Sequence, residues 1–221
     1  VYKRQANTEF EAGLAQERAC FLELRSSVEC AALRHVFFAE RSARPPASVE
    51  AADVKSLENS VVVGGGTMGA GIAYALLQSG SAVTLVERNA ASTDGARARV
   101  SGLLDSAVAR GLTSADKAAA HLASMRFQVG YDGLQDATFA IEAAFEDMAV
   151  KKAVLCALDN AMPDAVLATN TSYLDIDSMA GWLADPSRLV GLHFFSPAHI
   201  MKLLEIVRGK ASSDTALATG F

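Results

Sequence analysis

The chain has 221 residues, of which 51% are hydrophobic and 20% are charged, and its formal net charge is -5. This composition is that of an ordinary globular protein, and it lacks the basic excess typical of nucleic-acid binding. Apolar runs stay short of the ~18 residues that a membrane-spanning helix needs, and the N-terminus lacks the apolar core of a signal peptide. We therefore expect one sizeable domain with an appendage, no nucleic-acid partner and no membrane span.

The cysteines indicate the redox compartment of the protein, and the two chain ends indicate whether the chain is complete. Cys20, Cys30 and Cys156 are odd in number and widely spaced. This pattern fits reduced thiols in the cytoplasm better than a disulfide framework or a metal site. The chain lacks an initiator Met and stops at residues 219–221 without a closing element. We therefore expect a fragment of a longer cytoplasmic protein with no metal site.

The N-terminal segment is predicted to be helical. Thr8 and Glu11 form a capping-box signature, and apolar residues then recur at heptad-like intervals from Leu14 onward. A second apolar cluster occupies residues 33–38. Two such helices cannot bury an apolar stripe alone, so we expect the stripe to pack against the following domain or against residues upstream.

Strand and helix patterns alternate in the rest of the chain, after a break at two prolines. Such alternation predicts an α/β fold of the Rossmann type, with a doubly wound, mostly parallel sheet covered by helices on both faces. We divide the chain into a helical appendage at 1–41, a linker at 42–58 and the α/β domain at 59–221. Strands are expected at 60–63, 82–87, 126–129, 138–142, 166–169, 189–194 and 203–207, and helices at 68–79, 90–110, 148–161 and 174–183.

The strongest functional signal is the run from Val61 to Gly69, where three valines are followed by glycines spaced G-x-G-x-x-G. Apolar residues follow at helical spacing, so the run reads as strand, turn and helix. Gly64 then permits a tight turn, Gly66 lets the backbone approach a pyrophosphate, and Gly69 lets the helix pack close to the strand. The unpaired N–H groups at the start of the helix would face the phosphates. The alternative is a glycine-rich turn without a ligand, which this context disfavours.

Glu87 ends the second predicted strand and indicates which dinucleotide is bound. It lies at about the 20-residue offset expected of the acid that hydrogen-bonds an adenosine ribose. A carboxylate repels a 2′-phosphate at this position, so NAD is favoured over NADP. The neighbouring Arg88 weakens this preference, because an arginine can accommodate that phosphate.

Polar residues follow three later strands, where open α/β sheets bind their ligands. Asn170 and Ser172 follow one strand, His193 lies in an apolar stretch, and Glu205 lies among aliphatic residues. An ionised glutamate there is costly unless it is solvated or paired. A pairing of Glu205 with His193 would explain both residues. Taken singly, each has a structural alternative, such as a buried structural histidine, a solvent-facing glutamate, or side chains that shape a turn.

Several segments together resemble the NAD-binding domain of 3-hydroxyacyl-CoA dehydrogenases. The resemblance covers roughly residues 59 to 221 in the correct order, which makes it more specific than the glycine motif alone. Residues 8–41 are similar to the end of an enoyl-CoA hydratase/isomerase module, and their position suggests a fused, multifunctional fatty-acid β-oxidation enzyme. The segments that carry the dehydrogenase resemblance are Gly64 to Ala73, Ile141 to Asp147 with Lys151 and Lys152, Thr169 to Ser172, and His193 to Pro197 with Met201 to Glu205.

The resemblance implies oxidation of (S)-3-hydroxyacyl-CoA to 3-ketoacyl-CoA with NAD as the cofactor. This reaction needs a base with a near-neutral pKa, as histidine provides. By resemblance, His193 is the base, Glu205 orients it and stabilises its protonated form, Ser172 hydrogen-bonds the reacting oxygen, and Asn170 positions substrate or nicotinamide. The cofactor contacts implied in the same way are Gly64, Gly66, Thr67, Met68, Gly69, Glu87, Glu146, Lys151 and Asn170.

The chain also departs from the family pattern. Gly65 stands where family members often carry alanine, and the family's helical second domain, which completes the substrate cleft, would lie beyond Phe221. The resemblance further implies a homo-oligomer or a complex with a thiolase, in a cytoplasm of bacterial type. Two alternatives stay open: a truncated NAD-binding module without independent activity, and a stand-alone 3-hydroxybutyryl-CoA dehydrogenase, which the N-terminal appendage disfavours.

Overall fold

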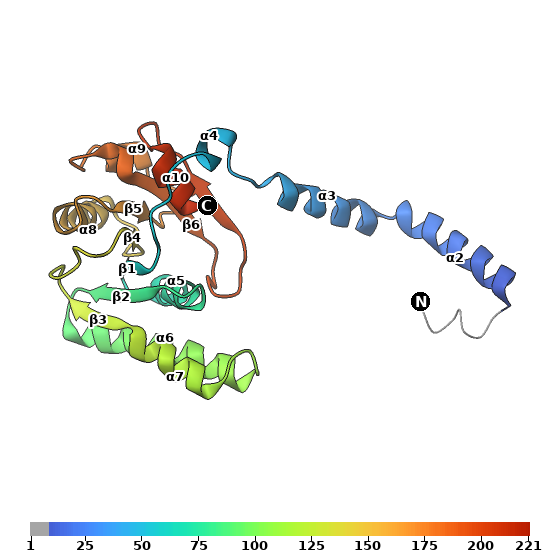
Figure 1. Ribbon diagram of the computed structural model, residues 1–221, viewed down its shortest axis with the longest axis horizontal. Coiled ribbons are helices and arrows are strands. Elements are labelled where there is room, and N and C mark those ends of the chain that lie inside the picture. Colours follow the sequence, from blue (N-terminus) through green and yellow to red (C-terminus); the bar gives the residue numbers. More distant parts are fainter. Residues whose placement is uncertain (1–8) are drawn as a thin grey trace. The chain divides into compact units, whose positions relative to one another are not determined.

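The structure is a computed structural model that describes residues 9–221, and the chain forms two compact units that meet between Pro46 and Ala47. The N-terminal unit contains the helices α2 (Phe10–Arg25) and α3 (Val28–Ser42), drawn in blue in Figure 1. The side chain of Ser27 caps α3 by accepting a hydrogen bond from the N–H of Cys30. Thr8, the expected capping residue of the first helix, lies outside the described residues.

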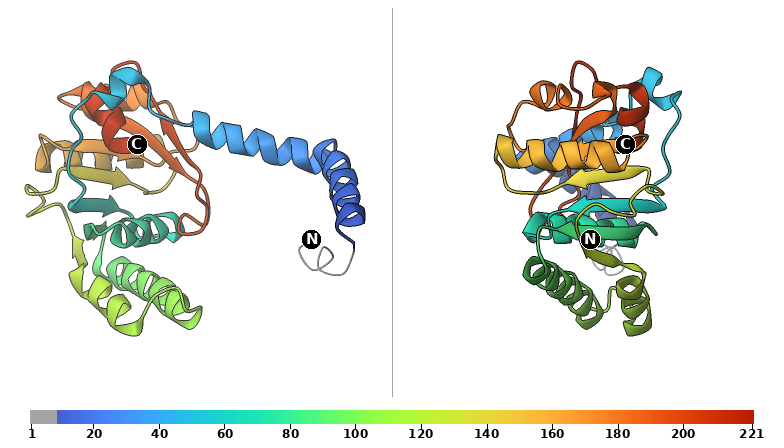
Figure 2. Two further views of the ribbon diagram at one scale, coloured as in Figure 1. Left: turned by 45° about the vertical axis from the view of Figure 1, so that its right-hand side comes forward. Right: turned by 90° about the vertical axis from the view of Figure 1, so that its left-hand side faces the viewer.

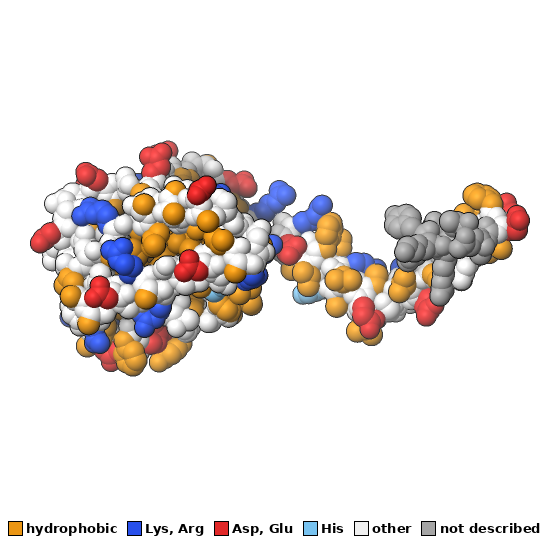
Figure 3. All heavy atoms as spheres, turned by 90° about the horizontal axis from the view of Figure 1, so that it is seen from below, with side chains coloured by type: hydrophobic (Ala, Val, Ile, Leu, Met, Phe, Trp, Pro, Cys, Tyr) orange, Lys and Arg blue, Asp and Glu red, His pale blue; other side chains and the backbone are white. Residues whose placement is uncertain are grey.

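The apolar side chains of α2 and α3 are exposed. Phe21 is 59% exposed, Val28 is 81% exposed and Leu33 is 71% exposed. Figure 3 shows hydrophobic side chains on the surface of these helices, and within residues 10–42 neither helix contains a buried residue. The apolar residues noted in the sequence are therefore uncovered in the N-terminal unit.

The second unit is built on a seven-stranded sheet of order β3-β2-β1-β4-β5-β6-β7. The first six strands are parallel, and β7 runs antiparallel to β6 at the edge. The Rossmann-type fold predicted from the sequence is thus confirmed, with each strand within a residue of its expected position. The strands are β1 (Asn59–Val63), β2 (Ala82–Glu87), β3 (Arg126–Val129), β4 (Phe139–Glu142), β5 (Val166–Thr169), β6 (Leu189–Phe194) and β7 (Leu204–Val207).

Helices cover both faces of the sheet (Figure 2). Side chains alternate along a strand, so Val62 of β1 packs with α5, α6 and α10, whereas Val61 and Val63 pack with α8 and α9. None of the helices in the described residues is long and apolar enough to cross a membrane. The helices of this unit are α4 (Ala47–Glu50), α5 (Thr67–Gln78), α6 (Ala90–Ala109), α7 (Ala115–Ser124), α8 (Met148–Ala161), α9 (Ile176–Ala180) and α10 (Asp214–Gly220), with a 3₁₀ turn at Pro186–Arg188.

Several helices differ from expectation. Our expected helix ranges omit α7, although its alanine-rich sequence is typical of a helix. They also omit α10, which ends the chain where we expected no closing element. Ser213 caps α10, which is only seven residues long. Helix α4 lies within the segment expected as a linker, and its Val49 is buried in the sheet's core. Helix α9 ends three residues early, since Gly181 follows it.

Candidate functional site

The glycine turn joins β1 to α5 where the strand order reverses, between β1 and β4. Gly64 has a φ of +92°, and a Cβ at this residue would lie 2.8 Å from the carbonyl oxygen of Ala143. A Cβ on Gly69 would lie 1.7 Å from the carbonyl oxygen of Gly64. At Gly66 the Cβ position faces open space. The fold therefore requires Gly64 and Gly69 themselves, whereas Gly66 leaves room for a ligand beside the helix N-terminus.

A cleft of about 1230 Å³ opens at this switch point. The glycine turn, the end of β2, the start of α6 and the segments after β3 and β4 form its walls. Its volume exceeds the ~300–1,000 Å³ of pockets for drug-sized ligands, so it suits an elongated ligand such as a dinucleotide. Of the predicted cofactor residues, Gly64, Gly66, Thr67, Met68 and Glu87 line the cleft, whereas Gly69, Glu146, Lys151 and Asn170 are not among its described lining residues.

Two charged side chains hold the peptide groups of Gly65. The N–H of Gly65 donates to Oε1 of Glu87 over 2.7 Å, and Nη1 of Arg99 donates to the Gly65 carbonyl over 3.1 Å. Glu87 thus lines the cleft, as its predicted ribose role requires, and also braces the turn. We did not predict Arg99, because an arginine on a helix gives no sequence signal until the helix is docked beside the turn.

The space beside Gly65 is filled by α6. A Cβ at Gly65 would lie 2.2 Å from Cβ of Ala96 and 3.0 Å from Cδ2 of Leu85. An alanine at this position would therefore clash with Ala96 and Leu85. We expect Gly65→Ala to lower the free energy of unfolding by about 1–3 kcal/mol, the usual cost of overpacking.

The matched second variant is Ala96→Gly, which removes the atom that would clash. In the double variant Gly65→Ala/Ala96→Gly, we expect part of the lost stability to return, measured by thermal denaturation as a double-mutant cycle. Simple addition of the two single losses would show that the contact between Gly65 and Ala96 is not the cause.

His193 and Glu205 lie directly opposite each other on the antiparallel strands β6 and β7. Nδ1 of His193 lies 2.8 Å from Oε2 of Glu205, so the predicted pairing is present. The Glu205 side chain is 54% exposed, because β7 is an edge strand. The carboxylate is therefore both solvated and paired, despite its aliphatic neighbours in the sequence. With Nδ1 occupied, Nε2 is the nitrogen left to face a substrate.

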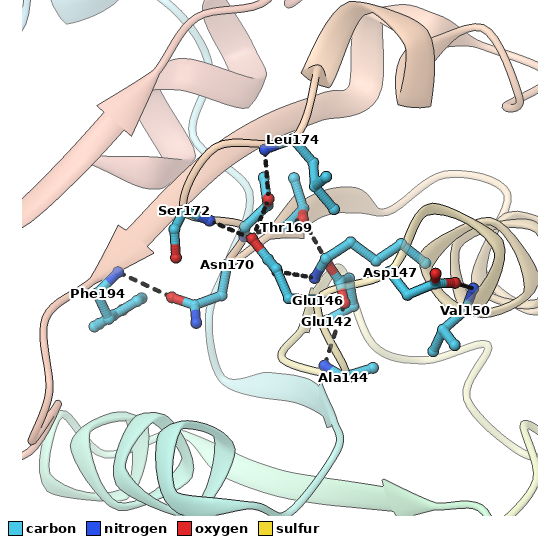
Figure 4. Close-up of polar contacts among 12 residues, drawn as sticks. Glu142, Ala144, Glu146, Asp147, Val150, Thr169, Asn170, Ser172, Leu174 and Phe194 are labelled. Carbon is cyan, nitrogen blue, oxygen red and sulfur yellow. Dashed lines mark hydrogen bonds and ion pairs between the residues drawn. The ribbon is translucent and has the colours of Figure 1, made fainter.

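The turn after β5 carries Asn170 and Ser172 (Figure 4). Oδ1 of Asn170 accepts a hydrogen bond of 2.9 Å from the N–H of Phe194, the residue after His193. Because β5 and β6 are parallel neighbours, the turn after β5 and the end of β6 lie on the same side of the sheet, at the carboxyl ends of the parallel strands. The side chain of Ser172 is exposed, and its N–H donates to Oε1 of Glu146 over 2.7 Å. The structure thus brings the predicted catalytic side chains to the carboxyl ends of the parallel strands.

Glu146 and Lys151, predicted to contact the cofactor, belong to an ionic cluster in which Lys151 is buried and Glu146 is partly exposed. Lys151 is 1% exposed, and its Nζ lies 2.7 Å from Oε1 of Glu142 and 3.1 Å from Oε2 of Glu146. Burial raises the pKa of Glu142 despite the opposing contacts with Lys151 and Thr169. Burial also acts on Glu146, but hydrogen bonds from Thr171, Ser172 and Lys151 outweigh it and hold its pKa below the usual value.

We did not predict a role for Glu142. It lies in the segment Ile141 to Asp147 that carries the resemblance, but taken singly it is an acid that ends an apolar strand, and this signal also fits a solvent-facing residue.

Comparison with known proteins identifies the family. Residues 59–221 match the model of the 3-hydroxyacyl-CoA dehydrogenase NAD binding domain. The peroxisomal bifunctional enzyme of Cavia porcellus is 36% identical over 216 residues, which cover 95% of this chain and 30% of that protein. The corresponding enzyme of Danio rerio is 37% identical over 223 residues, which cover 98% and 30%. The chain thus spans about 30% of the length of these relatives.

Solved structures agree with the family match. FadB2 of M. tuberculosis superposes with a TM-score of 0.72 at 35% identity, covering 75% of this chain and 59% of that chain. The dehydrogenase part of C. elegans multifunctional enzyme 1 gives a TM-score of 0.68 at 29% identity, covering 81% and 42%. The family match includes every strand of the sheet and all the residues of the candidate site. The chain therefore belongs to the family of NAD-binding domains of 3-hydroxyacyl-CoA dehydrogenases.

Proposed function

We propose that this chain is the cofactor-binding part of an NAD-dependent dehydrogenase that oxidises (S)-3-hydroxyacyl-CoA to 3-ketoacyl-CoA in fatty-acid β-oxidation. The 2.8 Å contact between His193 and Glu205 carries this proposal, because it supplies an oriented histidine at the edge of the sheet where the cleft opens. The family match and the names of the relatives support the same reaction.

The cleft fits the proposed cofactor. The backbone at Gly66 and Thr67 is exposed at the start of α5, where N–H groups and the helix dipole attract phosphates. Glu87 at the end of β2 would hold the adenosine ribose. We propose that Met68, Glu146, Lys151 and Asn170 lie toward the nicotinamide half, while Gly64 and Gly69 shape the turn. When bound, NAD supplies the hydride acceptor.

The protein's own groups would then manage the proton and the reacting oxygen. His193 takes the hydroxyl proton on Nε2, while Glu205 keeps the ring oriented and stabilises the imidazolium. The hydroxyl of Ser172 donates a hydrogen bond to the oxygen that becomes the ketone. Asn170, fixed by Phe194, keeps the Ser172 turn beside the strand that carries His193.

The rest of the protein is proposed on other grounds. The bifunctional relatives match 95–98% of the chain, including the residues before position 59. This match supports the proposal that residues 1–41 end an enoyl-CoA hydratase/isomerase module. Assembly as a homo-oligomer or with a thiolase, and a cytoplasmic location of bacterial type, stay predictions; relatives are named as peroxisomal or glyoxysomal proteins. Sedimentation of the full-length protein and imaging of a fluorescent fusion test them.

The reverse reaction tests the proposed activity. We expect the full-length protein to consume NADH when acetoacetyl-CoA is added, and to hydrate an enoyl-CoA in a separate assay. A folded protein that binds NADH but does not consume it would instead be a binding module without independent activity. Dehydrogenation of short acyl chains without hydration would indicate a stand-alone 3-hydroxybutyryl-CoA dehydrogenase.

A further inference from the structure

Glu142, the last residue of β4, joins three elements beneath the candidate site. It is 0% exposed. Its Oε1 accepts hydrogen bonds from Lys151 of α8 and from the hydroxyl of Thr169, the last residue of β5. Its Oε2 accepts a hydrogen bond of 3.2 Å from the N–H of Ala144, a residue that lines the cofactor cleft. One carboxylate therefore fixes the ends of two neighbouring strands and the start of α8.

The same contacts continue to the turn that carries Ser172 (Figure 4). Lys151 bridges Glu142 to Glu146, whose Oε1 accepts from the hydroxyl of Thr171 over 2.6 Å and from the N–H of Ser172 over 2.7 Å. An unbroken series of polar contacts thus links the wall of the cofactor cleft to the backbone of Ser172. The series crosses from β4 through α8 to the loop after β5.

Stability alone does not account for this cluster. Two carboxylates share one ammonium, and buried ion pairs are often no more stable than apolar side chains of similar size. Burial raises the pKa of Glu142, and a carboxyl whose pKa is higher in the folded chain lowers stability as the pH rises through that interval. The cluster does, however, define the position of the turn, because hydrogen-bonded charges tolerate little displacement.

We propose that Glu142 is a positioning residue of the dehydrogenase site, which acts through Lys151 and Glu146 to hold the Ser172 turn in register with the cofactor cleft. This inference rests on the function proposed above for Ser172. A hydroxyl that must meet the reacting oxygen is sensitive to small shifts, since a misplacement of about 1 Å can lower a rate by about 10²-fold.

The test is Glu142→Gln in the full-length protein. The single amide oxygen of glutamine can accept from Lys151 and Thr169 or from Ala144, but not from both sides. We expect kcat for acetoacetyl-CoA reduction at saturating NADH to fall by about 10- to 100-fold, whereas the Kd for NADH should rise by a smaller factor, because Glu142 also holds Ala144 at the wall of the cleft. The deuterium isotope effect on kcat with 4-deuterated NADH should rise, because hydride transfer becomes slower relative to the other steps.

Asp159→Asn is the matched control. Asp159 pairs with the largely buried Arg188, near the other end of α8. We expect both substitutions to change the melting temperature, but only Glu142→Gln to change kcat and the isotope effect. Equal kcat losses in the two variants, or a loss in Glu142→Gln that a weaker Kd for NADH explains, would overturn the proposal.

A second variant, Thr169→Val, tests the proposal if Glu142→Gln does not fold. Thr169→Val removes the hydroxyl that donates a hydrogen bond to Glu142 and accepts one from the N–H of Thr171 in the same turn. Valine nearly preserves the side-chain volume, so the variant should also lower kcat and raise the isotope effect. Ser172→Ala separates this inference from the function on which it rests. Failure of the wild type to consume NADH would contradict the proposed function, and wild-type activity in Ser172→Ala would contradict the role of Ser172 on which this inference rests. An impaired Ser172→Ala with unaffected Glu142→Gln and Thr169→Val would contradict only the role of Glu142.

Discussion

Replacing His193 with alanine is expected to lower kcat for acetoacetyl-CoA reduction by about 10²–10⁴-fold, the range of general acid–base catalysis. In this direction the imidazolium would return its proton to the new hydroxyl. The Kd for NADH should stay close to that of the wild type, because His193 is not among the described residues that line the cofactor cleft. Rates of NADH consumption and NADH titrations of the full-length protein measure both effects.

Glu205→Gln tests whether the 2.8 Å contact matters for the reaction. An amide can still orient the ring but cannot stabilise its positive charge, so we expect a clear but smaller loss of kcat. Groups that act as a unit give non-additive losses, and His193→Ala/Glu205→Gln should be no slower than His193→Ala. His121→Ala on α7 is the control and should retain wild-type activity. A His193→Ala protein with wild-type kcat, or additive losses in the double variant, would contradict the proposed pair.

The sheet could be predicted from the sequence because its strands are buried on both faces. Residues 61–63 are all valine, and such β-branched runs are typical of central parallel strands. Glycine spacing then locates the turn, since its positive φ and its close backbone contacts leave no room for a Cβ at Gly64 and Gly69. Helix α10 was not predicted, because a helix of seven residues is too short to show a clear apolar period.

The contacts of the candidate site likewise include some that could be predicted from the sequence and some that could not. The contact between His193 and Glu205 could be predicted, because each residue is anomalous in an apolar strand and the other explains it. The contacts of Glu142 could not be predicted, because its burial depends on how α8 docks and where Lys151 then points. Arg99 shows the same limit, since its hydrogen bond to Gly65 arises only when α6 packs beside the turn.

Alanine substitutions at Gly69 and Gly66 are expected to separate folding from cofactor binding. A Cβ on Gly69 would lie 1.7 Å from the backbone oxygen of Gly64, so the turn itself must open. We expect Gly69→Ala to lower the free energy of unfolding by at least about 1–3 kcal/mol, as overpacking does, and to lose NADH binding with the turn. Thermal denaturation and NADH titration measure the two effects.

Gly66→Ala should act on binding alone. Gly66 has a φ of -65°, which any residue adopts, and nothing lies within 4 Å of its Cβ position. The variant should therefore melt like the wild type. If the pyrophosphate lies against this exposed backbone, the added methyl group occupies part of the space that the pyrophosphate needs. The Kd for NADH should then rise about 10- to 100-fold, equivalent to about 1.4–2.8 kcal/mol. Gly102→Ala, also in open space, is the control and should bind NADH normally. Normal NADH binding by Gly66→Ala would show that the phosphates do not lie against the backbone at Gly66.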